Sequence, residues 1–426
     1  MNCDLIMSEG LPKYIYNLLK KIGQLGDKSE YNTYVVGGFV RDLMLDWENL
    51  DIDIVIEGDS KYFANLLAKS KNGKANIYEQ FGTAVVFLSN KLKVDIATAR
   101  TETYERPGAL PTVKPGTIED DLKRRDFTIN AMAIKLNEKE FGELIDPLGG
   151  ESDLKKGIIR VLHDKSFQDD PTRIFRAIRY EQRYEFQLDK NTENLLKVAV
   201  QEDFLSTITK ERLRNEIFLI LDEWDPADMI ARMAQFKLLK YIHPKISFSK
   251  KIMTLLDKME LIDFFRGIPL LVNKEEINMP LLRLMAMVDE LNDKETEEVI
   301  KNLALSKEYA ENLIASKTKL LDAIKAISDE SVMPSDIYKA LKDLPNQALF
   351  FGIHKASDKE TVLKILTYIV LVDEKPFVTG KDLKRLGYQE GPLYSEILED
   401  VFYAQIDEKV STKQEAIEYI LQKYEK

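Results

Sequence analysis

YVVGGFVRDLMLDWENLDIDIVIEG (residues 34–58) joins a glycine turn, an arginine–aspartate pair and a D-x-D pair of carboxylates in one short segment. Residues 34–36 predict a short buried strand that ends at Gly37-Gly38, where the missing side chains let backbone N–H groups approach a phosphate closely. Residues 39–45 predict the first turns of a helix. The segment therefore indicates a mixed α/β unit with a candidate phosphate site at its turn.

The two acids of this segment alternate with apolar residues. Asp51 and Asp53 should project from one face of a strand, roughly 7 Å apart along the backbone. Carboxylate oxygens at this spacing suit magnesium, which keeps positions open for water and for nucleotide phosphates. A lone D-x-D is also common on half-exposed edge strands, so the pair by itself is a weak signal of catalysis.

A third acid could face the same site. Asp95 lies in a second strand-like run, KLKVDIATAR (residues 91–100). An ordinary acid near a strand end explains this position equally well.

The segment DLKRRDFTINAMA (residues 121–133) predicts a charged entry followed by an apolar helix. Arg124 and Arg125 carry guanidinium groups, which match phosphate oxygens bidentately, and the carboxylate of Asp126 can hold an arginine or accept a ribose hydroxyl. Asn130, four residues later, would lie on the same helical face as Asp126. The alternative is a solvated helix cap with an intrahelical ion pair.

The third dense element is DDPTRIFRAIRYEQR (residues 169–183), where proline after an acidic cap predicts a helix start. Arg173, Arg176, Arg179 and Arg183 recur every three or four residues and should align along one side of that helix. Such a stripe is usually a solvated face, but arginine without lysine between 173 and 179 favours directional contacts to bases and phosphates.

In this order and spacing, GGFVRD, DID, RRDFTINAMA and DDPTRIFRAIRYEQRYEF resemble the successive motifs of the class II tRNA nucleotidyltransferases and bacterial poly(A) polymerases, members of the polymerase β-like superfamily. The resemblance covers residues 31–216. The segment TGKDLKRLGYQEGPLYSEILEDV (residues 379–401) also resembles the closing part of these enzymes, whereas residues 225–370 match little.

The resemblance implies a catalytic site in which two metal ligands hold Mg2+ and a set of basic, acidic and amide side chains binds the nucleotide. The catalytic candidates are Asp51, Asp53 and Asp95, of which Asp51 and Asp53 are the metal ligands. The nucleotide-binding candidates are Gly38, Arg41, Arg124, Arg125, Asp126, Asn130, Asp170, Arg173, Arg176 and Arg179.

Within this set, Asp170 and Arg173 take the positions of the family's amino-acid template, which pairs with the base edge of CTP or ATP. The family's leading glutamate is replaced here by Asp169, one methylene shorter, so the acid that orients the arginine is expected to sit differently. The segment 100–113 resembles the mobile loop of A-adding enzymes more than that of bifunctional CCA-adding enzymes.

The implied reaction is attack of the tRNA 3′-hydroxyl on the α-phosphate of CTP or ATP, with release of pyrophosphate. An enzyme that adds only A or only CC and a poly(A) polymerase remain alternatives. So do an antibiotic-modifying type of nucleotidyltransferase and a non-catalytic RNA-binding protein. The dipeptide His163-Asp164 is not taken as an HD phosphohydrolase site, because that site needs a further histidine upstream.

Composition limits the setting in which the chain acts. A single cysteine, Cys3, excludes an internal disulfide framework and suits the cytoplasm, and we expect no disulfide-linked partner. No apolar run is long enough to cross a membrane. The formal charge of −11 does not exclude tRNA as a partner, because binding depends on local patches. Lys381, Lys384 and Arg385 could form such an RNA-binding patch or be solvated lysines and arginine of a helix-turn-helix.

The expected fold is an α/β catalytic head with a small mixed sheet, polymerase β-like, followed by an elongated all-α arm. We expect a helix at 11–25 and strands near Tyr34, Asp51, Ala84 and Val94 and before Asp146. From Lys155 onward the spacing is helical. Breaks fall near 224–226, 267–269, 333–334 and 375–376. The expected domains are a head (1–150), a helical neck with the template (151–222), a helical body (223–330) and a tRNA-binding tail (331–426).

Overall fold

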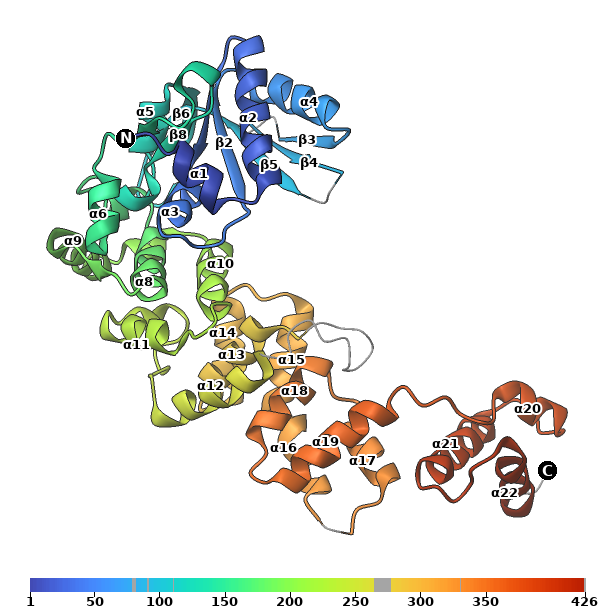
Figure 1. Cartoon of the computed structure of the whole chain (residues 1–426). Helices are drawn as coiled ribbons and strands as arrows, with labels where there is room; N and C mark the ends of the chain where they lie inside the picture. The colour runs from blue at the N-terminus through green and yellow to red at the C-terminus, as the bar shows by residue number, and fades with distance from the viewer. Residues whose placement is uncertain (79–81, 90–91, 110, 264–276, 330, 425–426) are drawn as a thin grey trace. The chain divides into compact units, whose positions relative to one another are not determined.

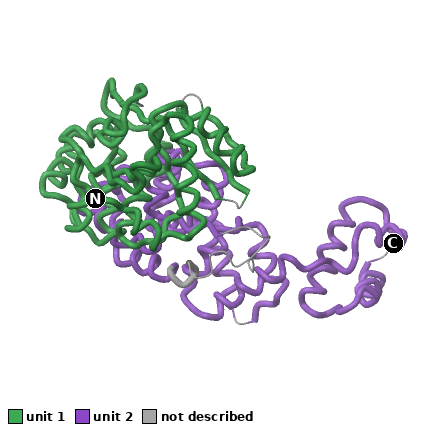
Figure 2. Tube along the Cα trace, turned by 45° about the horizontal axis from the view of Figure 1, so that its top comes forward, with its two compact units in different colours: residues 1–216 green, residues 217–426 purple. Residues whose placement is uncertain are grey.

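The computed structural model describes the chain except for residues 79–81, 90–91, 110, 264–276, 330 and 425–426. The chain divides into two compact units, Met1–Glu216 and Ile217–Lys426 (Figure 2). The first unit contains strands and helices, and the described part of the second contains helices (Figure 1). The α/β head and the all-helical region that follows it are therefore confirmed. The division into four domains remains a prediction.

A seven-stranded mixed sheet forms the centre of the first unit, in the order β3-β4-β5-β2-β1-β8-β9. Its strands are β1 (Asn32–Val36), β2 (Ile52–Glu57), β3 (Lys74–Tyr78), β4 (Thr83–Phe87), β5 (Lys93–Thr98), β8 (Ala133–Lys135) and β9 (Leu144–Ile145). Neighbouring strands are antiparallel except β2 and β5, which run parallel with Asp53 opposite Asp95. The strands expected near Tyr34, Asp51, Ala84 and Val94 and before Asp146 are all present.

Helices cover the two faces of this sheet unequally. On one face pack α2 (Lys13–Lys28) and α4 (Ser60–Ser70), as Figure 1 shows. On the other face, α5 (Ile118–Lys123) covers the part formed by β1 and β2, where Val36, Val55 and Leu122 share a buried cluster. The helix expected at 11–25 corresponds to α2.

The remaining elements of the first unit lie outside the seven-stranded sheet, and the last of them, α10, extends past Glu216 into the second unit. They are α1 (Asp4–Gly10), α3 (Gly38–Met44), β6 (Arg100–Thr103), β7 (Thr112–Pro115), η2 (Thr128–Asn130), η3 (Glu138–Glu140), α6 (Gly150–Lys156), β10 (Ile158–Ile159), α7 (Ser166–Asp169), α8 (Arg173–Arg183), β11 (Gln187–Leu188), α9 (Lys190–Gln201), η4 (Phe204–Thr207) and α10 (Lys210–Leu221). Strands β6 and β7 pair as a hairpin, so the ends of the segment expected to be a loop are ordered. The short pair β10–β11 interrupts the region that was expected to be helical.

One expected helix is wrong. The segment 121–133 does not continue as an apolar helix, because α5 ends at Lys123 and β8 begins at Ala133. Between them, the backbone N–H of Thr128 donates to the carbonyl of Arg160, and Phe127 forms a β-bridge with Val161. These long-range hydrogen bonds replace the helical ones, so the apolar residues of the segment are buried as turn and strand.

The second unit packs its described helices around apolar cores. They are α11 (Ala227–Gln235), η5 (Leu238–Tyr241), α12 (Lys250–Asp263), α13 (Met279–Val288), α14 (Asp293–Asn302), α15 (Lys307–Lys317), α16 (Lys319–Ile327), α17 (Pro334–Leu341), α18 (Asn346–Lys355), α19 (Lys359–Leu371), α20 (Gly380–Arg385), α21 (Pro392–Ile406) and α22 (Lys413–Lys423). The expected breaks near 224–226, 333–334 and 375–376 fall between helices. The break at 267–269 lies outside the described residues. None of the helices in the described part is long and apolar enough to span a membrane.

Candidate active site

A cavity of about 880 Å³ lies in the first unit, between the turn after β1, the start of β2, the segment after α5, and helices α8 and α10. Seven arginines and no lysine occur among the described residues that line it. All ten nucleotide-binding candidates and both metal-ligand candidates line this cavity: Gly38, Arg41, Asp51, Asp53, Arg124, Arg125, Asp126, Asn130, Asp170, Arg173, Arg176 and Arg179. Three separate sequence motifs therefore meet in one place.

The glycine turn forms part of the cavity wall, which Gly38 lines. Gly37 has φ +69°, and a Cβ there would lie 2.5 Å from Nη1 of Arg125, so a side chain would collide with that guanidinium. Helix α3 then places Arg41, which is buried and donates from Nε and Nη2 to the two carboxylate oxygens of Asp42 at 2.7 and 2.8 Å. Its Nη1 donates to Oδ1 of Asn130 at 2.5 Å. Arg41 is thus held rigidly at the cavity wall.

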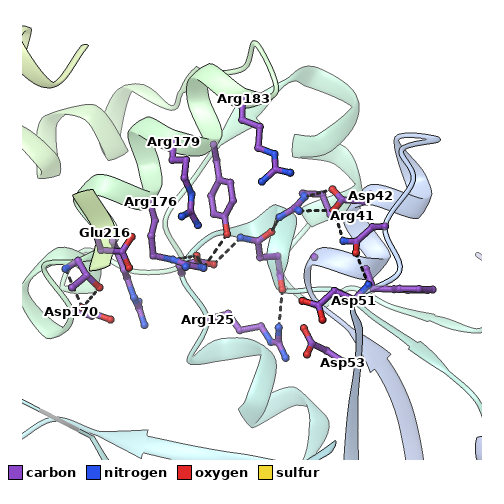
Figure 3. A pocket seen from close by; sticks show the side chains of 18 of the residues that line it. Arg41, Asp42, Asp51, Asp53, Arg125, Asp170, Arg176, Arg179, Arg183 and Glu216 are labelled. Atoms are coloured by element: carbon purple, nitrogen blue, oxygen red, sulfur yellow. Dashed lines mark hydrogen bonds and ion pairs between the residues drawn. The ribbon is translucent and has the colours of Figure 1, made fainter. Parts of the chain in front are cut away.

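The carboxylates lie at the start of β2. Asp51 immediately precedes the strand and Asp53 lies within it, and the two side chains are close together in Figure 3. Asp95 stands beside Asp53 on β5 but lines a neighbouring hollow instead of the arginine-rich cavity, and its carboxylate lies 2.6 Å from Nζ of Lys93. The structure therefore brings Asp95 next to the pair without placing it in the same cavity.

The electrostatics of Asp53 fit a cation site. Burial and the negative charges of Asp51 and Asp95 raise the pKa of Asp53 to about 6, against the lowering effect of Arg125. A divalent cation would relieve this repulsion, and one or two carboxylates plus substrate phosphates are the usual protein ligands of a small hard cation. Among the described residues, no group of three or more His, Cys, Asp or Glu side chains is arranged to hold a metal alone. The donor set thus suits a cation whose coordination a nucleotide completes.

Asp126 is the centre of a buried hydrogen-bond network. Its Oδ1 accepts from the amide of Asn130 at 3.0 Å, and its Oδ2 accepts from Nε of Arg176 at 2.8 Å. Burial alone would raise the pKa of Asp126, but Arg176, the Asn130 amide and Arg173 hold it at about 2. Asp126 and Asn130 meet as expected, but through a turn and η2 and not on one face of an α-helix.

The two arginines before Asp126 share one buried acid. Nη2 of Arg124 lies 2.7 Å from Asp121, and Nη2 of Arg125 lies 3.0 Å from the other oxygen of the same carboxylate. Nη1 of Arg124 also reaches Glu102 on β6 at 3.0 Å. Nε of Arg125 is buried and has no hydrogen-bond partner among the described residues. A buried donor at a cavity wall without a protein partner is a candidate contact for a ligand.

Helix α8 carries the arginine stripe. Arg176, Arg179 and Arg183 project from it into the cavity (Figure 3). The helix begins at Arg173, two residues later than the Asp-Pro signal suggested, with Thr172 as its N-cap. Arg173 itself is buried and donates to Oγ of Ser166 and to the carbonyl of Arg124, both at 2.7 Å.

The template candidate Asp170 is held through one oxygen. Its Oδ1 accepts from the backbone N–H and hydroxyl of Thr172 at 3.1 and 2.6 Å and from Nη2 of Arg212 at 2.7 Å. Asp169 lies 4.0 Å from Nε2 of His163, so the acid that replaces the family's glutamate faces a histidine at this distance. His163 belongs to the turn before α7, where its carbonyl accepts from the N–H of Ser166.

Several cavity residues were missed from the sequence. Glu216 on α10 lines the cavity, burial raises the pKa of its carboxyl, and its Oε2 is buried with no partner among the described residues. Tyr104, whose hydroxyl donates to Glu102 at 2.9 Å, comes from the segment between β6 and β7. Asn49 bridges the two halves of the first motif, since it donates to Asp42 at 2.6 Å and accepts from the N–H of Asp51 at 2.8 Å. No local pattern marks these residues.

The RNA-binding candidates lie outside the cavity, in the second unit. Lys381, Lys384 and Arg385 are exposed on the short helix α20. Nζ of Lys384 lies 2.9 Å from Glu390, and Nη1 of Arg385 lies 3.9 Å from Asp382. Their role in RNA binding remains a prediction.

Comparisons with known proteins give consistent results. The family model described as "Poly A polymerase head domain" matches residues 33–160, "Probable RNA and SrmB- binding site of polymerase A" matches residues 185–249, and a tRNA nucleotidyltransferase domain 2 matches residues 279–421. An A-adding tRNA nucleotidyltransferase of Geobacter sulfurreducens is 40% identical over 415 residues, covering 96% of this chain and 47% of the relative. This chain therefore spans about half the length of that relative.

A second relative matches over nearly its whole length. The A-adding tRNA nucleotidyltransferase of Halalkalibacterium halodurans is 31% identical over 97% of this chain and 94% of its own. Among solved structures, an apo CCA-adding enzyme is 36% identical with a TM-score of 0.80, covering 100% of this chain and 99% of that one. The Thermotoga maritima CCA-adding enzyme complexed with tRNA_CCA is 35% identical with a TM-score of 0.74 and the same coverage.

Proposed function

The chain belongs to the tRNA nucleotidyltransferase and poly(A) polymerase family, and we propose from this premise that it adds C and/or A to the 3′ end of tRNA. The reaction would consume CTP or ATP and release pyrophosphate, without a nucleic-acid template. This proposal rests on one observation: Asp51, Asp53 and seven arginines line the same cavity. We place the reaction in the cytoplasm, where tRNA and nucleoside triphosphates occur together.

The carboxylate end of the cavity would serve the reacting phosphate. Asp51 and Asp53 would hold a divalent cation, Mg2+ in our proposal, which neutralises charge on phosphate oxygens and favours ionisation of the attacking hydroxyl. Asp53 lies in a strand of the central sheet, and Asn49 holds the backbone N–H of Asp51. Rigid placement of both acids limits reorganisation during the reaction.

The arginine end would bind the nucleotide. Arg125, Arg176 and Arg179 supply positive charge where the triphosphate would lie, and the Asp126–Asn130 pair offers acceptor and donor groups for ribose hydroxyls. Asp170 and Arg173 would read the base edge. The three hydrogen bonds to Oδ1 of Asp170 fix the carboxylate while leaving Oδ2 to accept from a base amino group.

Addition of A alone is the narrower candidate. Both relatives described above are A-adding enzymes, and segment 100–113 resembles the loop of that class. The two solved structures described above are instead CCA-adding enzymes. We also propose four modules: a head (1–150), a helical neck (151–222), a helical body (223–330) and a tRNA-binding tail (331–426). Lys381, Lys384 and Arg385 lie in the tail.

Labelled CTP and ATP offered with tRNA transcripts that end before, within and just before the end of CCA would test this function. The purified chain should extend at least one of these transcripts, and products read at nucleotide resolution would identify the bases added. Incorporation into unstructured RNA as fast as into tRNA would instead indicate a poly(A) polymerase. Absence of incorporation with any transcript would contradict the proposal.

A further inference from the structure

A second hollow, of about 620 Å³, lies on the sheet face that carries Asp53 and Asp95. Strand register defines this face. Asn76, Val85, Asp95 and Asp53 form one row across β3, β4, β5 and β2. Tyr78 and Thr83 lie on one side of this row, and Phe87 and Lys93 lie on the other. The alternate residues of β4, Ala84 and Val86, are buried on the opposite face, where α4 packs.

Two aromatic side chains are exposed on this face. Tyr78 retains 49% and Phe87 44% of its accessible surface, and both line the hollow. Tyr78 on β3 is paired with Thr83, which precedes Phe87 by four residues on β4. The two rings are therefore roughly 13 Å apart along the strands, so one base could not contact both. Exposed aromatic rings on a sheet are a common platform for unpaired bases, because every base offers a flat face.

The hollow lies next to the nucleotide cavity. Both are lined by Asp53, Arg124 and Arg125. In nucleotidyl transfer the attacking hydroxyl and the leaving pyrophosphate lie roughly in line on opposite sides of the phosphorus. If the triphosphate occupies the arginine side of Asp53, the hydroxyl must approach from another side, and this hollow opens there.

We propose that this face holds the last two nucleotides of the RNA 3′ end, with one base against Tyr78 and one against Phe87. Lys74, opposite Phe87 on β3, would supply positive charge for a backbone phosphate. Lys93 on β5 lies beside Phe87 but is ion-paired with Asp95, with its Nζ 2.6 Å from that carboxylate. Stacking reads no base edge, so the platform would accept an RNA end whose last base changes as the end grows. This inference rests on the proposed function, because it assigns the acceptor of the same reaction.

The test compares Tyr78→Ser, Phe87→Ser and the double variant with Tyr62→Ser. Tyr62 is a matched control, since it is 53% exposed and lies on α4 behind the same strands. Each single platform variant should raise the KM for tRNA about 5- to 150-fold, the range for loss of one stacked base, and the double variant should raise it further. The KM for ATP or CTP should stay within about twofold of its normal value. Phe87→Tyr should keep near-normal KM for tRNA. Thermal unfolding of every variant checks the fold.

A second arm uses tRNA transcripts with an abasic residue at the last or the penultimate position. If a ring stacks on a base, removing that base should abolish the effect of removing the ring. Loss of the variant's effect with one abasic transcript would support the platform. Equal effects on all transcripts, a tRNA KM that matches the Tyr62→Ser control, or a parallel rise in the KM for ATP would overturn it. Inactivity of the unaltered chain would instead refute the proposed function.

Discussion

At the scale of single residues, Asp53 provides the most direct test of the proposed cation site. Asp53→Asn keeps size and shape but removes the charge that a cation requires. We expect kcat/KM for incorporation of either nucleotide to fall about 10³-fold or more, because cation catalysis supplies several kcal/mol. The free energy of unfolding should not decrease, since the change removes repulsion from Asp51 and Asp95. Near-normal turnover of Asp53→Asn with Mg2+ would remove the carboxylate pair from the mechanism.

Arg173 provides a test of base reading. Arg173→Lys retains a positive charge but loses the planar fork that donates to Ser166 and to the carbonyl of Arg124. We expect the ratios of kcat/KM among CTP, ATP, UTP and GTP to change about tenfold or more, because a hydrogen bond to a charged group contributes about 1.5–3 kcal/mol. The measurement is steady-state kinetics with the four nucleotides.

The matched control for this prediction is Arg183→Lys on the same helix. Arg183 is exposed and lines the cavity, so this change should slow all four nucleotides to a similar degree. Arg176 is a poorer control, because its loss would leave the carboxylate of Asp126 buried without its cation. Unchanged nucleotide ratios in Arg173→Lys would return Arg173 to a structural role.

At the scale of elements, α10 joins the hairpin segment to the turn before α8. Nη1 of Arg212 donates to the carbonyl of Gly108 at 3.0 Å, and Nη2 donates to Asp170 at 2.7 Å. Gly108 has φ +69°, and a Cβ there would lie 2.3 Å from Oγ1 of Thr207, so the segment is closely docked. Arg212 therefore connects the segment between β6 and β7 to the base-reading candidate.

Arg212→Met should weaken discrimination among CTP, ATP, UTP and GTP, and it should have a smaller effect on kcat for the preferred nucleotide. The physical reason is that Asp170 loses its charged partner while Asp51 and Asp53 are unchanged. The kinetics of the four nucleotides check this expectation, and Arg214→Met on the same helix is the control. If Arg212→Met and Arg214→Met give the same nucleotide ratios, the connection through α10 has no role in selectivity.

Helix α18 contains a buried histidine that should make the second unit sensitive to acid. Nδ1 of His354 lies 2.9 Å from the carbonyl of Phe350, while its Nε2 has no partner among the described residues. Burial, together with nearby Lys258, lowers the pKa of His354 to about 4, although the Phe350 carbonyl opposes this effect. The unfolded chain binds the proton near pH 6.5, so the free energy of unfolding should fall as the pH decreases from about 6.5 to about 4.

At pH 5 the buried imidazole should lower the free energy of unfolding by about 2 kcal/mol relative to pH 7, and this decrease should be absent in His354→Leu. Denaturant unfolding at pH 7 and pH 5 measures the difference between the two proteins. Trp224 reports on the second unit once Trp47, the tryptophan of the first unit, is replaced by phenylalanine. A difference between the two proteins that does not change with pH would contradict a neutral buried imidazole.

At the scale of the whole molecule, the chain carries a formal charge of −11 and must still bind a polyanion. Local basic groups would then determine tRNA affinity, and each neutralised phosphate releases counterions. We expect log Kd for tRNA to rise linearly with log salt concentration, with a slope of about 0.9 per duplex phosphate contact. Fluorescence anisotropy with labelled tRNA measures the slope. A Kd that stays constant between low and high salt would contradict an RNA partner.

The same titration with Lys381→Gln, Lys384→Gln and Arg385→Gln addresses the C-terminal candidates. If these exposed groups contact RNA phosphates, each substitution should lower the slope by about one unit. An unchanged slope would indicate that these side chains are only solvated, on a helix that packs against the small core of Val378, Ile397 and Ile420.

Much of the fold could be predicted because it depends on local patterns. The strand before Gly37, the start of β2 and helix α3 follow from alternation and from the glycine turn. The arginine stripe of α8 follows from helical spacing, and the switch to helices after the head follows from the same period. These features are set by residues close together in the sequence, so the sequence by itself determined the main elements and three motifs of the site.

Contacts between distant segments decided the rest. Parallel pairing of β2 with β5 places Asp95 beside Asp53, and hydrogen bonds to Arg160 turn the 121–133 segment away from the helix that its composition favours. Glu216 and Arg212 reach the site from α10, where nothing in the helical period distinguishes them from solvated residues. Burial and long-range hydrogen bonds exist only after the chain has folded, so the cavity, its displaced pKa values and the exposed aromatic face were decided by the tertiary structure.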